Sequence, residues 1–210
     1  MKGREEEKDM RKRNQEGFSL IELLIVMMII LVLSALAIPG FQAIQRSLRI
    51  SGDSRNVFSS TSQAKMKAAA EFTHARARMS LTNRTYQIEK WDKTLNSWQV
   101  VNGTQYFSTG VGAGFGAVAA APPQTQVAIQ QAPVCRSNSP LVSPANLDAS
   151  GDVCIEFNSR GIPVDNSNSP TGNDALYITD GNTVFGVTVN AAGLMQSWSI
   201  GINEAQWTRR

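Results

Sequence analysis

One apolar stretch, from Phe18 to Ile38, constrains this chain more than any other feature. A helix over the stretch would measure roughly 31 Å, enough to cross the hydrocarbon core of a bilayer. Its polar side chains are the hydroxyls of Ser19 and Ser34 and one carboxylate, Glu22. Because an ionised carboxylate inside a membrane span costs on the order of 3 kcal/mol, we expect Glu22 to lie near the interface or to meet a cation.

Two ordinary interpretations of this stretch give the Glu22 carboxylate no role. As a permanent anchor, it would be oriented by the basic residues 11–13, which stay on the cytoplasmic side. As a secretory signal, it would be cut after Ala35-Leu36-Ala37, whose two alanines have the spacing of a signal-peptidase site, and the mature protein would begin near Ile38. An acid serves no purpose in a segment that is discarded, which argues against the second interpretation.

A third interpretation accounts for more residues. The run from Gly17 to Glu22 (GFSLIE) follows a charged leader and resembles the class III signal of type IV prepilins and type II secretion pseudopilins. The resemblance implies that a prepilin peptidase cleaves between Gly17 and Phe18 and that Phe18 becomes the N-methylated first residue. It also implies an assembly role for Glu22, whose carboxylate would pair with the amino terminus of a neighbouring subunit in a filament core.

Charge is distributed unevenly along the chain. Residues 1–17 carry six basic and five acidic side chains without apolar periodicity, as expected of a cleaved leader. Residues 46–93 contain ten Lys or Arg against four Asp or Glu, and residues 94–210 contain four against seven. The net charge of +3 is too small to identify a partner, but these two segments of the mature chain carry net charges of opposite sign.

The helical pattern extends beyond the apolar stretch. We expect a transmembrane or filament-core helix over residues 18–40, kinked at Pro39 and Gly40, because proline removes a donor and glycine weakens the turn. Apolar and small residues then recur at helical spacing, which predicts an amphipathic second half over residues 41–82. The outer face of this half would carry basic residues: Arg46, Arg49, Arg55, Lys65, Lys67, Arg76, Arg78 and Arg84.

The basic face has two interpretations, one structural and one functional. The structural interpretation, a solvated helix face without a partner, is favoured. The alternatives are contacts with acidic faces of adjacent subunits, or with phosphate groups through Arg76 and Arg78, to which Arg209 and Arg210 at the C-terminus would add. The lone His74, also in this region, has no second His or Cys nearby and predicts no metal site.

From residue 83 to 210 the pattern changes to that of an antiparallel β domain. We expect a hairpin with its turn at residues 92–97, and a second turn at Asn102 and Gly103. The Gly- and Ala-rich residues 108–133 predict a surface loop with a short strand at 127–129. The last third predicts one antiparallel meander, with strands at residues 153–157, 175–179, 183–189 and 195–200.

The two cysteines, Cys135 and Cys154, predict a disulfide if the domain is exported, because that compartment is oxidising and two thiols cannot complete a zinc site. Two free thiols are the less favoured alternative. The polar loop at residues 165–174 could hold calcium, but its spacing matches no EF-hand, so a solvated loop is favoured. No arrangement of residues supports catalysis or a cofactor, and we expect a protein that is not an enzyme.

The later part of the chain narrows the resemblance. Residues 75–81, a hairpin containing Trp98, the segment 155–161 and Ala192-Gly193 are similar to the GspH/FimT group of minor pseudopilins and minor pilins. This resemblance implies an α+β, pilin-like fold, in which the long N-terminal helix packs on an antiparallel sheet. It also implies that other pilin subunits, a prepilin peptidase and an inner-membrane platform with a separate ATPase are partners.

The implied function is that of a structural or adaptor subunit in secretion or pilus biogenesis. The domain would be periplasmic, with the leader cytoplasmic before cleavage. The alternative is a minor pilin that binds DNA or surfaces in DNA uptake or adhesion. Against it, Gly193 is followed by Leu-Met-Gln, whereas members that bind DNA carry basic residues there. The sequence leaves open a secretion pseudopilus or an extracellular pilus, and a major or a minor subunit.

Overall fold

A computed structural model describes residues 18–116, 118, 132–142, 145–172 and 174–210. In these ranges one long helix, α2 (Leu20–Ala70), precedes a set of strands. The chain divides into two compact units between Gln45 and Arg46, a boundary that falls inside α2. The first part of the helix and the domain from Arg46 onward are therefore described separately.

Helix α2 is continuous through Pro39 and Gly40. The expectation that the helix continues past this pair is confirmed, whereas a kink at the pair stays a prediction. The side chains from Leu20 to Ile38 are exposed, and an 18-residue window of the helix has a mean hydropathy of 2.9 with none of it buried. By length and composition this helix could cross a membrane.

The helix ends earlier than the sequence pattern predicts. It stops at Ala70, and residues 75–80, expected to be helical, form strand β1 (Ala75–Ser80). Phe72 adopts a left-handed φ of 49°, and the Thr73 amide donates to the Ala68 carbonyl at 3.1 Å, which closes the helix as a Schellman motif. The expected helical boundary at residue 82 is therefore wrong, because a phenylalanine takes the position where glycine usually signals the stop.

Two antiparallel sheets make up the rest of the domain. The first has the order β3-β2-β1-β5-β6 and the second the order β10-β9-β8-β7-β4. Besides β1, the first sheet contains β2 (Thr85–Asp92), β3 (Ser97–Tyr106), β5 (Val153–Phe157) and β6 (Pro163–Val164). The second contains β4 (Gly112–Ala113), β7 (Asp174–Thr179), β8 (Thr183–Val189), β9 (Met195–Gly201) and β10 (Thr208–Arg209).

The strand positions in the last third are confirmed, but their arrangement as one meander is wrong. Strand β5 pairs with β1 in the first sheet, and only β7, β8 and β9 follow one another in the second. Asn102 and Gly103 do not end a strand either: both have positive φ inside β3, where the register with β2 shifts. They form a bulge rather than a turn. The strand expected at residues 127–129 lies outside the described residues.

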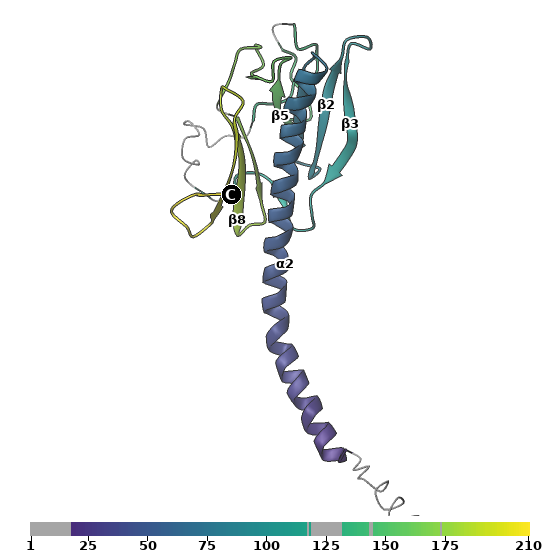
Figure 1. Ribbon diagram of the computed structural model, residues 1–210, viewed down its shortest axis with the longest axis vertical. Coiled ribbons are helices and arrows are strands. Elements are labelled where there is room, and N and C mark those ends of the chain that lie inside the picture. Colours follow the sequence, from purple (N-terminus) through teal and green to yellow (C-terminus); the bar gives the residue numbers. More distant parts are fainter. Residues whose placement is uncertain (1–17, 117, 119–131, 143–144, 173) are drawn as a thin grey trace, which may run out of the picture. The chain divides into compact units, whose positions relative to one another are not determined.

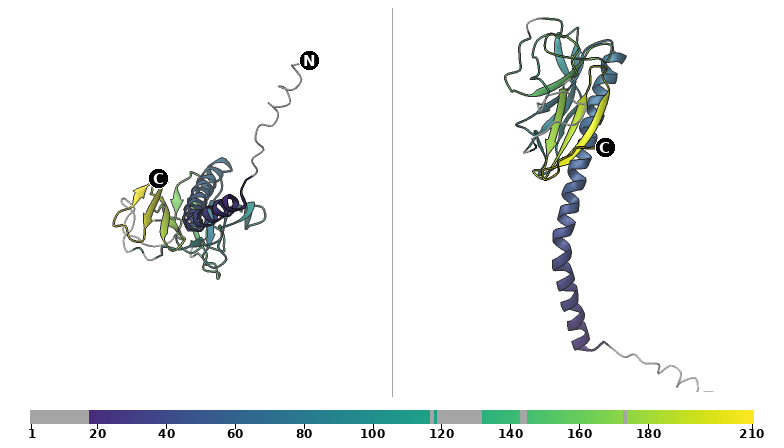
Figure 2. Two further views of the ribbon diagram at one scale, coloured as in Figure 1. Left: turned by 90° about the horizontal axis from the view of Figure 1, so that it is seen from below. Right: turned by 90° about the vertical axis from the view of Figure 1, so that its left-hand side faces the viewer.

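The second half of α2 packs against both sheets. Ile50, Val57, Ala64 and Ala68 share one core with residues of β1, β2, β5, β7 and β8. In Figure 1 this part of the helix lies between β2 and β3 on one side and β8 on the other, and Figure 2 shows the same layers after quarter turns. A long N-terminal helix on antiparallel sheets confirms the expected α+β, pilin-like fold.

Two local features hold the domain together. Cys135 and Cys154 form the expected disulfide, with Cα atoms 5.0 Å apart. The second feature lies on helix α2, where the Lys65 ammonium donates to the Gly193 carbonyl at 2.8 Å. Gly193 and Gly161, both with φ +72°, belong to two turns that meet on this lysine. The lysine thus joins the helix to a turn from each sheet.

Candidate functional site

The N-terminal end of α2 is the part of the chain with the clearest functional chemistry. Phe18 is 80% exposed, and the Leu23 amide donates to the Ser19 carbonyl at 3.1 Å in the first turn. Glu22 lies in this turn and is exposed. No described residue pairs with its carboxylate. Gly17 lies outside the described residues.

Comparison with known protein families identifies a motif in this same N-terminal segment. Residues 12–38 match the model of the prokaryotic N-terminal methylation motif. No curated protein and no solved structure gives a significant match to the chain. The motif supports a protein of the type IV pilin-like class, and the apolar N-terminal helix is long and apolar enough to serve as its membrane segment. It implies processing by a prepilin peptidase and assembly with other pilin-like subunits, and its family is structural rather than enzymatic.

A buried ionic network occupies the face of the first sheet that points away from α2. Arg76 is 1% exposed, and its Nε donates to Glu89 Oε2 at 2.6 Å. Its Nη1 donates to the Arg136 carbonyl, and its Cζ lies 3.9 Å from the ring centroid of Trp98. Burial lowers the pKa of Arg76, and the charge of Glu89 opposes this shift. Arg76 is therefore a buried strand residue, and the expectation that it lies on an exposed basic helix face is wrong.

A second buried arginine, Arg136, extends the network. Its Nε lies 3.0 Å from Glu156 Oε2, and its two terminal nitrogens donate to the carbonyls of Pro140 and Asp165. The other oxygen of Glu156 lies 2.8 Å from His74 Nδ1. His74, which the sequence pattern places on the helix, thus lies beyond its end as a buried partner of Glu156. Because Arg136 follows Cys135, the disulfide fixes the backbone that carries this guanidinium.

Arg78 is the partly buried end of the network. Its Nε and Nη2 both donate to Asp152 Oδ2, at 2.9 and 2.8 Å, and Nη2 also lies 2.7 Å from Asp148 Oδ2. Nη1 lies 3.4 Å from Glu89 Oε1. Burial alone would lower the pKa of Arg78, but the Asp152 hydrogen bond and the nearby carboxylates outweigh it and raise the pKa. With three carboxylates around it, Arg78 is also not on a free basic face, contrary to the sequence expectation.

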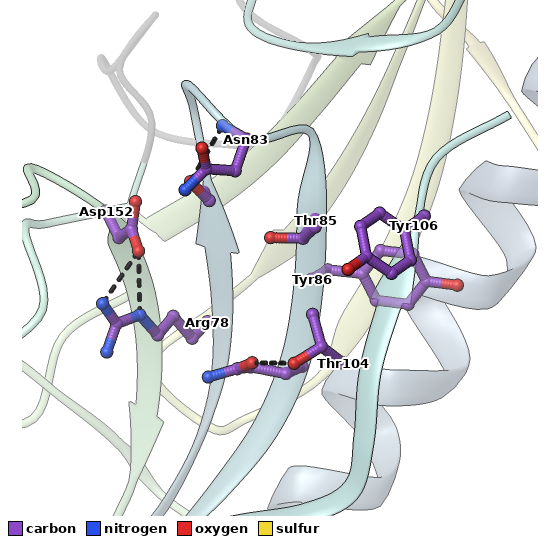
Figure 3. Close-up of a pocket in the computed structure, with 9 residues that line it drawn as sticks. Arg78, Asn83, Thr85, Tyr86, Thr104, Tyr106 and Asp152 are labelled. Carbon is purple, nitrogen blue, oxygen red and sulfur yellow. Dashed lines mark hydrogen bonds and ion pairs between the residues drawn. The ribbon is translucent and has the colours of Figure 1, made fainter. Parts of the chain in front are cut away.

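An open polar cavity of about 540 Å³ lies beside Arg78 and Asp152. Figure 3 shows Thr85, Thr104 and Tyr106 arranged with this pair around the opening, on strands β1, β2 and β3 and the residue before β5. The Thr104 hydroxyl donates to Gln87 Oε1 at 2.7 Å. Sequence reasoning missed this cavity, because its residues come from segments that only the sheet register brings together. The alternation of Ala and Arg in residues 75–78 was the available signal.

The C-terminal arginines lie on the edge of the second sheet. Arg209 is exposed in β10, and Arg210 Nε donates to Ser199 Oγ at 2.7 Å. Arg210 and Arg55 both line a cavity of about 430 Å³ beside the helix. Phosphate contacts by Arg209 and Arg210 stay a prediction.

The polar loop at residues 165–174 is organised by its own backbone. Asp165 Oδ1 accepts hydrogen bonds from the amides of Ser167 and Ser169 at 2.8 and 2.9 Å. Asp174 begins β7 and is buried, and burial followed by the charge of Asp165 raises its pKa to about 7. Within the described ranges no group of three His, Cys, Asp or Glu side chains could hold a metal.

Proposed function

We propose that this chain is a minor subunit of a type II secretion pseudopilus or a type IV pilus, similar to the GspH/FimT group. The observation that carries the proposal is the coincidence of the methylation motif at residues 12–38 with an apolar helical segment, residues 20–38, whose side chains are all exposed. An apolar helical segment that buries none of its side chains within the described chain needs lipid or other subunits as its surroundings.

In the proposed mechanism the precursor inserts into the inner membrane with its leader in the cytoplasm and its domain in the periplasm. A prepilin peptidase cuts after Gly17, and Phe18 is N-methylated. Cleavage creates a cation at the end of an apolar helix, four residues before Glu22. When helices leave the lipid and bundle, Glu22 of one subunit pairs with the amino terminus of the next, which offsets the desolvation of both charges.

The remaining parts have supporting roles in this mechanism. Pro39 lacks a backbone donor and glycine weakens the turn at Gly40, so this turn is where the helix can bend as subunits pack. The domain from Arg46 onward acts as an adaptor toward other subunits. Energy for assembly comes from a separate ATPase on the inner-membrane platform.

The Glu22→Ala variant tests the assembly role. We expect it to insert and to be cleaved like the wild type, but to enter filaments at least about tenfold less, because the incoming amino terminus loses its counter-charge. Immunoblots of sheared filaments against the membrane fraction measure this ratio. Ser34→Ala, which removes a polar group from the same span without removing charge, is the matched control and should assemble normally. Normal incorporation of Glu22→Ala would contradict the proposal.

A further inference from the structure

The cavity beside Arg78 has no role in the assembly mechanism. Its lining combines polar side chains with aromatic rings. Cross-strand pairs place its side chains on one face: Ser80 opposite Thr85, Arg78 opposite Gln87, and Thr85 opposite Tyr106. This is the face of the first sheet that points away from α2. The cavity volume, about 540 Å³, lies within the roughly 300–1,000 Å³ typical of small-molecule sites.

The charges around the cavity are already satisfied. Arg78 is surrounded by Asp152, Asp148 and Glu89, and the last of these is held in turn by Arg76. An anionic ligand would have to compete with three carboxylates for the Arg78 guanidinium. A cationic ligand would have to compete with that guanidinium for the carboxylates. The site therefore selects against strongly charged ligands, phosphates included.

The groups that are free in the cavity are uncharged. No described residue makes a hydrogen bond with the hydroxyl of Thr85, the side-chain amide of Asn83 or the hydroxyl of Tyr106. Together they offer several donors and acceptors at the rim of one opening, as Figure 3 shows. A ligand that satisfies them must itself carry several hydroxyl or amide groups.

Tyr106 adds an aromatic surface to these polar groups. It is 76% exposed at the end of the edge strand β3, and its ring borders the cavity. The face of an aromatic ring is electronegative and attracts the weakly positive C–H groups of a partner. A ring beside hydroxyls and amides matches a sugar, which presents C–H groups on one face and hydroxyls at its edge.

We propose that this cavity binds a neutral oligosaccharide, with Tyr106 stacked on one sugar ring and Asn83 and Thr85 bonded to its hydroxyls. The Arg78–Asp152 pair forms one wall of the cavity. The site lies in the domain from Arg46 onward, so its occupation does not depend on the proposed assembly of the N-terminal helix.

Saturation-transfer difference NMR on the full chain tests the proposal. The protein is kept in phosphocholine micelles, because maltoside detergents would compete for the site. Cellotetraose, maltotetraose and chitotetraose are the neutral probes, and a single-stranded oligodeoxythymidine is the anionic one. We expect transfer to at least one neutral probe, and an affinity about tenfold lower in Tyr106→Ala. Tyr106→Trp, which keeps an aromatic surface, should retain binding.

Phe72→Ala is the matched control, since Phe72 is 74% exposed but lies outside the cavity, and it should bind like the wild type. Unchanged thermal melts by circular dichroism establish that both alanine variants are folded. The proposal is overturned if none of the three neutral probes shows transfer at millimolar concentration, if Tyr106→Ala binds like the wild type, or if the oligodeoxythymidine displaces the sugar.

Discussion

Gly193 leaves little room for a side chain at the place where two turns meet on helix α2. A Cβ at this position would lie 2.8 Å from the Gly161 carbonyl oxygen and 3.2 Å from Lys65 Nζ, at a φ of +72°. The same lysine donates to the Gly193 carbonyl. A side chain here would therefore separate the two turns that meet on the helix.

Gly193→Ala should lower the free energy of unfolding by about 2 to 3 kcal/mol, the sum of left-handed strain and the steric displacement of Gly161. Gly181→Ala separates these two effects, because Gly181 has φ +88° and no atom lies within 4 Å of the position that its Cβ would take. It should cost about 1 kcal/mol, the strain alone. Urea denaturation of both variants measures the difference, and equal losses would refute the role given to the Gly161 contact.

Asp174 makes stability depend on pH near neutrality. Its pKa is about 7 in the folded chain against an ordinary value of 3.8, so between these values the folded protein holds a proton that the unfolded chain has lost. The free energy of unfolding therefore falls as the pH rises through this window, and the loss is complete above about pH 7. At lower pH both states are protonated and the effect vanishes.

Asp174→Asn should remove this dependence. Relative to the wild type, the variant should gain on the order of 3 kcal/mol between about pH 4 and pH 8. The difference between the two proteins is the quantity to measure, because carboxylates with lowered pKa values, such as Asp148 and Asp92, affect both equally. Chemical denaturation across this range gives the answer, and a difference that is constant with pH would rule the explanation out.

At the scale of elements, the helix-to-strand transition near residue 72 was the part of the fold that the sequence could not reveal. Ala75 and Met79 are four residues apart, a spacing that fits one face of a helix and one face of a strand equally well. Arg76 and Arg78 fit a solvated helix face by composition. Strands β2 and β5 make residues 75–80 a strand and not a helix, because they bury Arg76 against Glu89 and pair Ala77 with Ile155.

The strands themselves were largely predictable, since alternation and turn residues mark their ends. The boundaries of β5 and β8 match the pattern, and the disulfide followed from the cysteine count and the expected compartment. Their division between two sheets was not predictable, because strand pairing over long sequence separations leaves no local signal. For the same reason the sequence did not show that the residues around the cavity beside Arg78 lie together, although the alternation of Ala and Arg in residues 75–78 was visible.

The disulfide element permits a direct test. Replacing Cys135 and Cys154 together by alanine should lower the free energy of unfolding by about 3 kcal/mol, because the unfolded chain regains the entropy of a loop of 19 residues. Guanidinium unfolding of this variant measures the loss, and reduction of the wild type with dithiothreitol should give the same value. If the variant is as stable as the oxidised wild type, the disulfide contributes no stability beyond that of the buried network around Arg136.

At the scale of the whole molecule, the chain combines two parts: an apolar N-terminal segment and a folded domain with its own core. The first carries the methylation motif and a helix with exposed apolar side chains, and the second buries its helix against two sheets. The sequence already indicated the first part, because Gly17, Phe18 and Glu22 form a local motif. The central claim of the account is that this motif is processed.

The N-terminus of the mature, membrane-extracted protein tests that claim most directly. Mass spectrometry of the full-length product should find a chain that begins at Phe18 with an N-methyl group, and Gly17→Glu should block this maturation. A mature chain that begins at Met1, or near Ile38, would contradict the account, as would normal maturation of Gly17→Glu.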